Sequence, residues 1–352
     1  MRPNLKEIFA MWQVIGHAKP VFLLKRSLEI GNLAHAYLLL GPQHVGKMTL
    51  ALNLAQALNC TADEPPCGQC DSCQKIGRTK HADIQIIGLR AGGESAEAKL
   101  RTEIGIDQIR ELQHSAFLPP FEGKCRVFII EGAEMLSTEA ANCLLKTLEE
   151  PAEKVVFVLL ATNEQLLPAT VVSRCQRLEL RPLPAGEIEA TLISHHDVEP
   201  PRARLLARLA HGCPGWAILA TTDDNLLKWR AETIERLLEI STADYDQRFS
   251  YAAQLATQFG QNKKMVRRVL DLWLYWWRDL LLSKIGAKDS IINVDHETGL
   301  ARMAQDYRLA HIKGVIDDIE EAKEQLGLNA NPQLVLEVLM LNIPKREAVK
   351  HG

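Results

Sequence analysis

The sequence predicts an α/β domain with a parallel sheet, followed by all-α domains. From residue 35 to about residue 183, short apolar runs alternate with amphipathic segments, which is typical of a parallel sheet covered by helices. After Arg181–Pro184 these runs stop, and nearly all of the remaining chain has helical periodicity. A length of 352 residues exceeds one ordinary core and favours two or three domains.

The predicted strands are four apolar runs, each dense enough in apolar residues to be buried on both faces of a sheet. These runs are Ala36–Leu40, Ala82–Gly88, Arg126–Glu131 and Val155–Thr162. Three amphipathic segments between them are predicted helices, and the third has Ser137 as its N-cap. They cover Gly46–Leu58, Asp107–Phe117 and Ser137 to just before Pro151.

The second half of the chain is predicted to be helical throughout. We expect boundaries near residues 183 and 225, which give an α/β domain at 1–183, a short three-helix domain at 184–224 and a longer helical domain at 225–352. The aromatic stretch Leu272–Leu282 has two interpretations, a base-stacking or membrane patch and a packed helix. Packing is favoured because aromatic residues at helical spacing usually fill cores.

Composition and charge exclude several classes of protein. The hydrophobic share of 47% and the charged share of 24% are typical of a globular protein. A net charge of -3 argues against a free-standing nucleic-acid binder, so any DNA contact is local or shared with partners. The first residues show no secretion signal, and no apolar run approaches the roughly 18 residues that span a bilayer. We therefore expect a cytoplasmic protein.

The stretch LLLGPQHVGKMTLAL resembles a phosphate-binding loop with one substitution. Gly41, Gly46 and Lys47 have the spacing of G-x-x-x-x-G-K-[ST], but Met48 occupies the position of the hydroxyl that binds magnesium. Thr49 does not replace that hydroxyl, because one step along a helix rotates a side chain by about 100°. The loop retains the features of a phosphate site and lacks a metal ligand.

The second sequence element of ATPases with a phosphate-binding loop, an acidic pair, is also incomplete here. It is normally an Asp-Glu pair at the end of a strand, the first acid on magnesium and the second polarising the attacking water. Here Glu131 is followed by Gly132, which has no side chain, and Glu134 reaches the site only after a rearrangement. Two independent losses predict a subunit that does not hydrolyse ATP.

Four of the eight cysteines are clustered. Cys60, Cys67, Cys70 and Cys73 form C-x6-C-x2-C-x2-C, a set of four thiolates that suits a tetrahedral structural zinc ion. In a reducing cytosol, clustered thiols hold metal more often than they form disulfides. The other four cysteines are predicted small core residues: Cys125, Cys143, Cys175 and Cys213.

Two further signals lie in LLATNEQLLPATVVSRCQRLEL. Thr162 and Asn163 end a buried strand, where a polar side chain can sense the γ-phosphate of a nucleotide. Arg174 follows a short helical segment at the domain edge, where an arginine can reach the ATP of a neighbouring subunit. The candidate nucleotide contacts are therefore Gly41, Gly46, Lys47, Thr49, Glu131 and Asn163.

Together these motifs resemble the clamp loader subunits of bacterial DNA polymerase III, which belong to the AAA+ proteins. The resemblance runs from VIGHAKPVFLLKRSLEIGNLAHAYLLLGP through the cysteines, EGAEMLSTEAANCLLKTLEEP and SRC to LRPLP, about the first half of the chain. In that family the gamma and tau subunits keep GK[ST] and the Asp-Glu pair, whereas delta-prime subunits tolerate their loss. Met48, Glu131 and Gly132 therefore point to the delta-prime type.

The resemblance implies an AAA+ nucleotide domain, a three-helix lid and a helical collar through which the subunits form an open hetero-pentamer. It implies partners of the gamma/tau and delta types, with the sliding clamp and primer-template DNA reached through the assembly. It also implies that Arg174 acts in trans on the adjacent gamma subunit. The lid arginine of active members would fall near Gly215 or Trp216, where this chain has none.

Several alternatives stay open from the sequence. The first is an active gamma/tau-type ATPase with Glu131 as its metal ligand; the others are an unrelated P-loop kinase and a zinc-bearing DNA-binding module. On the favoured interpretation the chain is a component of the polymerase holoenzyme, neither a polymerase nor an active ATPase. Its P-loop then holds ATP or ADP as a structural filler, or is empty.

Overall fold

The computed structural model describes residues 12–89, 103–328 and 330–345. Residues 1–11, which carry most of the segment expected to lack a secretion signal, lie outside the described residues. The chain divides into two compact units, Met1–Thr191 with Gly212–Trp216 and Leu192–His211 with Ala217–Gly352. The three-domain division with boundaries near residues 183 and 225 stays a prediction.

A five-stranded parallel sheet forms the centre of the first unit, in the order β2-β3-β4-β1-β5. Four strands coincide with the four predicted apolar runs, and the fifth was not predicted. The strands are β1 (Ala36–Leu40), β2 (Ile84–Ile87), β3 (Arg126–Glu131), β4 (Val155–Ala161) and β5 (Gln176–Glu179). Among the described residues, β5 pairs only with β1, and Leu178 is the one buried residue of its four. The prediction that every run is buried on both faces is wrong for β2. This strand lies at the edge of the sheet opposite β5 and is half-buried along most of its length.

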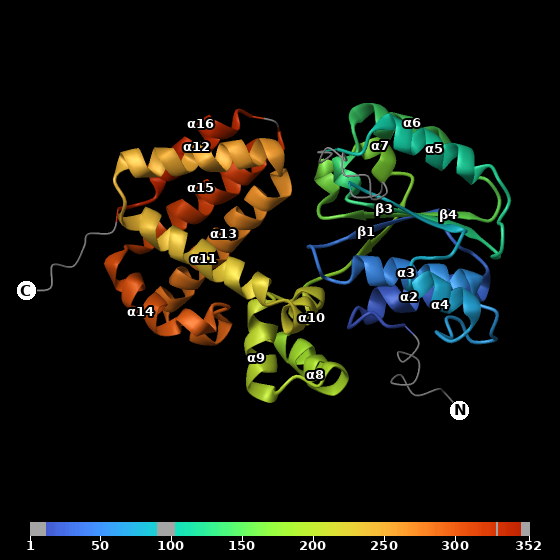
Figure 1. The fold of residues 1–352 in the computed structure, drawn as a ribbon, viewed down its shortest axis with the longest axis horizontal. Helices are drawn as coiled ribbons and strands as arrows, with labels where there is room; N and C mark the ends of the chain where they lie inside the picture. The colour runs from blue at the N-terminus through green and yellow to red at the C-terminus, as the bar shows by residue number, and fades with distance from the viewer. Residues whose placement is uncertain (1–11, 90–102, 329, 346–352) are drawn as a thin grey trace, which may run out of the picture. The chain divides into compact units, whose positions relative to one another are not determined.

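Helices cover both faces of this sheet, as Figure 1 shows. One face carries α2 (Ala18–Ile30), α3 (Lys47–Asn59) and α4 (Asp71–Gly77). The other carries α5 (Ile106–Ala116), α6 (Thr138–Glu149) and α7 (Ala169–Val172). Two 3-10 turns, η1 (Ala133–Met135) and η2 (Glu164–Leu166), follow β3 and β4. The predicted α/β fold with a parallel sheet is confirmed, as is the N-cap at Ser137.

Side chains of each strand alternate between two hydrophobic cores, one on each face of the sheet. In β1, Tyr37 and Leu39 belong to the core beneath α2 and α3. Ala36 and Leu38 belong to the core beneath α5 and α6. Because β1 is buried on both faces, the loop that follows it starts from a fixed point at the carboxyl edge of the sheet.

The remaining elements are helical, as predicted. Three helices follow the sheet: α8 (Ala185–His196), α9 (Pro200–Leu209) and α10 (Pro214–Thr222). Beyond α10, the described residues of the second unit form six further α-helices and two 3-10 turns. These are α11 (Asp224–Thr242), α12 (Tyr245–Gln261), α13 (Lys263–Ile285), η3 (Lys288–Ser290), η4 (Val294–His296), α14 (Glu297–Asp306), α15 (Leu309–Gly327) and α16 (Pro332–Asn342).

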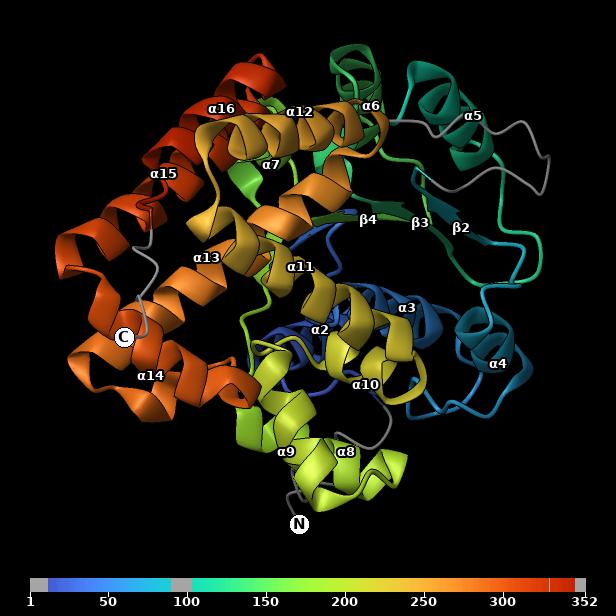
Figure 2. The same cartoon turned by 60° about the vertical axis from the view of Figure 1, so that its left-hand side comes forward.

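Helix α13 lies at the centre of the helical unit, where it contacts α11, α12, α14 and α15 (Figure 2). Its residues Trp273, Trp276 and Trp277 are at most 2% exposed. The packing interpretation of the aromatic stretch is therefore confirmed. Among the described residues, none of the helices combines the length and apolar character that a membrane span requires.

Candidate functional site

The phosphate-binding loop lies between β1 and α3, as its motif predicts. Gly41 and Gly46 have φ angles of 148° and 113°, a region that favours glycine. A Cβ atom at Gly41 would also collide with the carbonyl oxygen of Leu180. The N–H group of Gly41 donates to the Ala161 carbonyl at 3.2 Å, which fixes the loop to the end of β4.

Lys47 turns toward its own loop. Its ammonium group donates to the carbonyl oxygens of Gly41 and Pro42, the second at 2.8 Å. The lysine that would neutralise phosphate charge in a P-loop is thus held at the loop by backbone acceptors. The loop therefore keeps two glycines with positive φ and a lysine at the positions of the phosphate-binding motif.

Met48 lies where magnesium would need an oxygen ligand. Its side chain packs against the hydrophobic core beneath α3. A thioether is a soft ligand, whereas magnesium selects hard oxygen atoms, so Met48 supplies packing and no metal contact. Thr49 is the next residue of α3 and is half-buried in the first turn. The motif position that normally carries the magnesium-binding hydroxyl is therefore occupied by a side chain that packs against the core.

The acidic position lies at the same edge of the sheet. Glu131 is the last residue of β3 and is exposed. Gly132 follows with φ 71°, and its N–H group donates to the Leu160 carbonyl at 3.1 Å. Because Gly41 and Gly132 both bond to the end of β4, the structure brings the P-loop and the incomplete acidic pair together.

The polar residues after β4 form local hydrogen bonds. The Thr162 hydroxyl donates to a carboxylate oxygen of Glu134 at 2.8 Å, and the Thr162 N–H group donates to the same oxygen at 3.2 Å. The Asn163 side-chain oxygen accepts from the Gln165 N–H at 2.9 Å and caps η2. Glu134 thus fixes the end of β4, and Asn163 serves as a cap.

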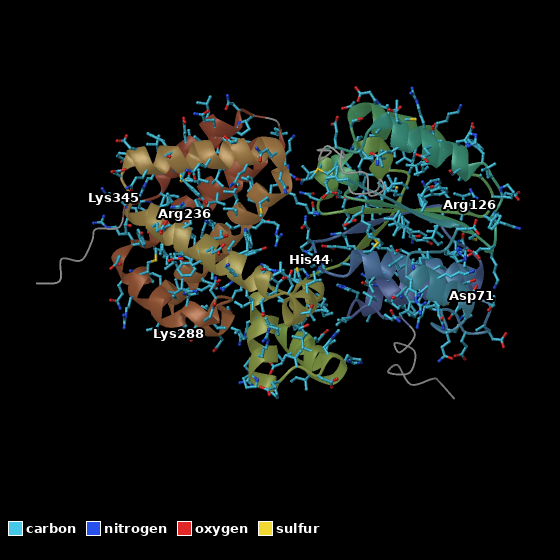
Figure 3. All side chains as sticks on the ribbon, viewed as in Figure 1. His44, Asp71, Arg126, Arg236, Lys288 and Lys345 are labelled. Carbon is cyan, nitrogen blue, oxygen red and sulfur yellow. The ribbon has the colours of Figure 1, made fainter. Side chains whose placement is uncertain are left out.

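The segment that opens α10 packs directly on the P-loop. The Gly215 N–H donates to the His44 carbonyl oxygen at 2.9 Å, and a Cβ at Gly215 would lie 2.9 Å from that oxygen. His44, labelled in Figure 3, has φ 61°. A side chain at Gly215, one of the two positions at which the resemblance places the lid arginine, would therefore press on the backbone of the loop.

The four predicted zinc ligands are brought together. The Sγ atoms of Cys60, Cys67, Cys70 and Cys73 all lie within 4.8 Å of one another, and those of Cys60 and Cys70 are 4.0 Å apart. A tetrahedral zinc ion with bonds of about 2.3 Å needs sulfur atoms about 3.8 Å apart. The donor set and its spacing therefore suit a structural zinc ion, which would cross-link the module and leave no coordination position open for catalysis.

Backbone N–H groups favour the thiolate form of two of these cysteines. The N–H of Cys70 donates to the Cys67 sulfur at 3.3 Å. This bond and one from Gln69 lower the pKa of Cys67. Burial by itself would raise the pKa of Cys70, but hydrogen bonds lower it to about 6. Burial raises the pKa of Cys73, so the cluster combines ready thiolates with a buried thiol that a metal ion would deprotonate.

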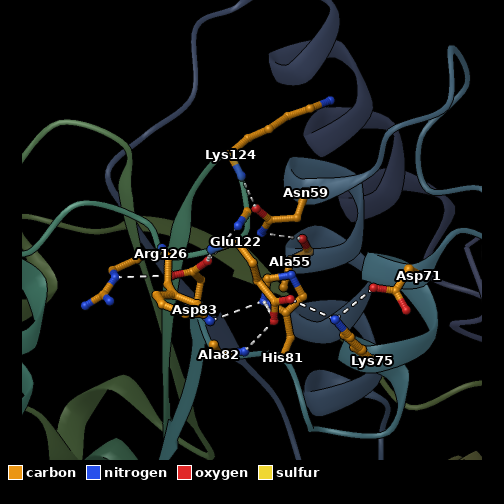
Figure 4. A network of polar contacts seen from close by, with 12 residues as sticks. Ala55, Asn59, Asp71, Lys75, His81, Ala82, Asp83, Glu122, Lys124 and Arg126 are labelled. Carbon is orange, nitrogen blue, oxygen red and sulfur yellow. Dashed lines mark hydrogen bonds and ion pairs between the residues drawn. The ribbon is translucent and has the colours of Figure 1, made fainter.

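A polar network ties this module to the loop between α5 and β3 (Figure 4). Asp83, buried at the start of β2, accepts three N–H bonds of 2.6 to 2.8 Å from the backbone of Phe121, Glu122 and Gly123. Lys75 of α4 binds both Asp71 and Glu122 at 2.8 Å. The cysteine module and this loop therefore form one hydrogen-bonded structure.

Asn59 and Lys124 complete this network. The Asn59 side-chain oxygen accepts from the N–H groups of Lys124 and Cys125, at 2.8 and 3.0 Å. The Lys124 ammonium donates to the carbonyl oxygen of Cys60, one of the four clustered cysteines. This network was not predicted from the sequence, because the pairing of Asp83 with the loop spans about forty positions and leaves no local signal.

Arg174 lies two residues beyond α7, at the surface of the first unit. Its guanidinium group binds a carboxylate oxygen of Glu149 at 2.5 Å and donates to the Thr170 carbonyl at 2.8 Å. The side chain is 34% exposed. Glu149 was not among the predicted residues, although an acidic residue at a helix C-terminus is an available signal. Arg174 is not part of the edge that holds the P-loop and Glu131.

Comparisons with known proteins agree with these observations. A family model described as DNA polymerase III, delta subunit, matches residues 16–184, and a second model, for the C-terminal part of the delta subunit, matches residues 225–345. The chain is 31% identical to the DNA polymerase III subunit delta' of Bacillus subtilis over 333 residues, 94% of this chain and 97% of that protein. The chain belongs to the clamp-loader subunit family of DNA polymerase III. The expected AAA+ fold and helical C-terminal region of this family are those described above.

Other clamp-loader relatives are longer. The chain is 32% identical to the DNA polymerase III subunit tau of Escherichia coli over 282 residues, 78% of this chain and 42% of that protein. Among solved structures, a DNA polymerase III gamma subunit-related protein of Thermotoga maritima has a TM-score of 0.39 at 14% identity, covering 92% of this chain and 99% of that one. RuvB of Thermotoga maritima has a TM-score of 0.38 at 19% identity, covering 62% and 61%.

Proposed function

We propose that this chain is a delta-prime-type clamp-loader subunit that does not hydrolyse ATP and acts in DNA replication. In this role it is a stationary member of a hetero-pentamer with gamma/tau and delta subunits, and it supplies Arg174 to the ATP site of the adjacent subunit. The sliding clamp and primer-template DNA are reached through the assembly. The domains are the α/β domain 1–183, the lid 184–224 and the collar 225–352.

The observation that carries this proposal is that Met48, at the position of the magnesium-binding hydroxyl in the motif, is partly buried and packs against the hydrophobic core. Gly132 has no side chain at the position of the second acid, and neither Gly215 nor Trp216 is an arginine. These three departures from a hydrolytic site support a chain that does not turn over ATP. The similarity to a delta' subunit over 97% of its length supports the same assignment.

The proposed contribution of this chain to ATP hydrolysis comes from Arg174. A guanidinium group carries a delocalised charge and N–H groups in a fixed planar arrangement, which match the oxygens of a phosphoryl group. Placed at the γ-phosphate of a neighbour's ATP, it would stabilise the charge that develops during transfer, an effect on the order of 10³- to 10⁵-fold in known arginine fingers. The clustered cysteines hold structural zinc and take no part in this step.

Turnover by the isolated chain tests the first half of the proposal. We expect no ATP hydrolysis above background, and Lys47→Ala should leave that background unchanged. Turnover that Lys47→Ala abolishes would instead establish the second candidate, a gamma/tau-type ATPase with Glu131 as metal ligand. The 32% identity to a tau subunit favours that candidate, as does the retained shape of the P-loop.

A further inference from the structure

The guanidinium group of Arg174 is held from two sides. Nη2 contacts the Oε1 atom of Glu149 at 2.5 Å, and Nη1 donates to the Thr170 carbonyl oxygen at 2.8 Å. These contacts come from the end of α6 and from α7, two elements anchored in the core on the same face of the sheet. The orientation of this long side chain is therefore set by the fold.

Glu149 occupies a position that helix electrostatics disfavours. It is the last residue of α6, where the helix dipole presents its negative end and favours cations. Glu150 follows it directly and is also exposed. A residue that opposes a local preference is expected where another role requires it. Among the described residues, the interaction that can require an acid at position 149 is its ion pair with Arg174.

We propose that Glu149 is a positioning residue for Arg174, a proposal that rests on the trans-acting role of Arg174. Glu149 accepts from Nη2, while the Thr170 carbonyl and the more distant Ser173 hydroxyl, at 3.5 Å, accept from Nη1. The group has five N–H donors, so further N–H groups stay available for phosphate oxygens. A guanidinium held in advance does not lose its rotamer freedom when the neighbour's nucleotide arrives. Glu149 thereby raises the rate of the neighbour's hydrolysis without touching the nucleotide.

The ion pair is a poor candidate for a purely stabilising contact. The side chains of Arg174 and Glu149 are 34% and 50% exposed. Ion pairs this accessible to solvent contribute little to folding, because water screens the charges and ordering both side chains costs entropy. Its effect should therefore be visible in the ATPase of the assembled loader and not in the unfolding of the chain.

The test is steady-state ATP hydrolysis by the reconstituted loader carrying Glu149→Gln. We expect kcat to fall about five- to thirtyfold, the range that corresponds to the side-chain entropy of one arginine, with KM for ATP within about twofold. Glu149→Asp, which keeps the charge, should recover part of the loss. The matched control is Glu150→Gln, which removes the same charge one residue away and should leave both constants unchanged.

Arg174→Ala separates the failure of this inference from the failure of the proposed function. If Arg174→Ala leaves hydrolysis intact, the proposed function fails and the inference fails with it. If Arg174→Ala abolishes hydrolysis but Glu149→Gln matches Glu150→Gln or raises kcat, the inference alone is overturned. Glu149→Gln should cause no further loss in an Arg174→Ala chain, and an additional loss there would overturn positioning through Arg174. Assembly of each variant is checked by size-exclusion chromatography.

Discussion

At the scale of single residues, Gly215 lies against the backbone of the P-loop. A Cβ at this position would lie 2.9 Å from the His44 carbonyl oxygen, closer than an ordinary van der Waals contact. We predict that Gly215→Ala lowers the free energy of unfolding by about 1–3 kcal/mol, the usual cost of overpacking. Chemical denaturation measures the change. Gly186→Ala is the control, because a Cβ at Gly186 meets nothing within 4 Å; equal effects of the two substitutions would contradict the packing described here.

Asp83 makes stability depend on pH. Burial by itself would raise its pKa, but the N–H groups of Phe121, Glu122 and Gly123 together with Arg126 lower the pKa below the ordinary value. A carboxyl group with a lowered pKa stabilises the fold above the pKa of the unfolded chain, about 3.9, and loses that contribution as pH falls further. At pH 7, Asp83→Asn should therefore lower the free energy of unfolding by about 2 kcal/mol.

The difference in free energy of unfolding between wild type and Asp83→Asn should shrink as pH falls below about 4. Protonation of Asp83 in the wild type then removes the same charge that the substitution removes. Denaturation curves at several pH values measure this trend. Asp63→Asn, at an exposed aspartate of the same unit, should show no such difference at any pH. If this difference in free energy of unfolding stays constant down to the lowest pH, the charge of Asp83 does not stabilise the loop between α5 and β3.

At the scale of elements, the cysteine module is the part that a metal ion should control. We predict one zinc ion per chain by elemental analysis and its loss in Cys70→Ser, because three thiolates bind zinc less tightly than four. The unfolding temperature should fall by several degrees, since the module is bonded to the loop between α5 and β3. Cys125→Ser, outside the cluster, should retain zinc. Full zinc content in Cys70→Ser would refute the assignment.

Elements with a strong local pattern could be predicted from the sequence, and edge elements could not. The strands β1, β3 and β4 are nearly continuous apolar runs because both of their faces are buried. Strand β5 lies at the sheet edge and reads Gln-Arg-Leu-Glu, so its apolar pattern is too weak to recognise. The interaction that forms it is its pairing with β1, about 140 positions earlier in the chain.

Buried polar side chains were also beyond sequence reasoning. Arg248 is 2% exposed, and its guanidinium group donates to backbone carbonyls at the ends of α11 and α16, including those of Ile240 and Met340. An arginine on an amphipathic helix is ordinarily expected in solvent. Only the packing of two helix C-termini around it makes burial favourable, because their carbonyl oxygens carry partial negative charge.

At the scale of the whole molecule, the candidate site divides into a part that the sequence could predict and a part that it could not. The P-loop glycines and lysine, the four cysteines, Met48 and Gly132 lie in contiguous motifs, so they could be proposed from spacing alone, and the structure brings the four cysteines together. The engagement of Thr162 with Glu134 and of Arg174 with Glu149 depends on chain segments that meet only in the fold. These contacts explain why the P-loop edge is occupied by structural interactions while the arginine stays at the surface.

The central claim is that this chain completes a neighbour's ATP site and has no working site of its own. The most direct measurement is ATP hydrolysis by the reconstituted loader with clamp and primed DNA, comparing wild type, Arg174→Ala and Lys47→Ala in this chain. We predict a loss of the turnover at the adjacent site on the order of 10³-fold in Arg174→Ala and little change in Lys47→Ala. Loss of activity only in Lys47→Ala would contradict this claim, because the P-loop of this chain would then be catalytic.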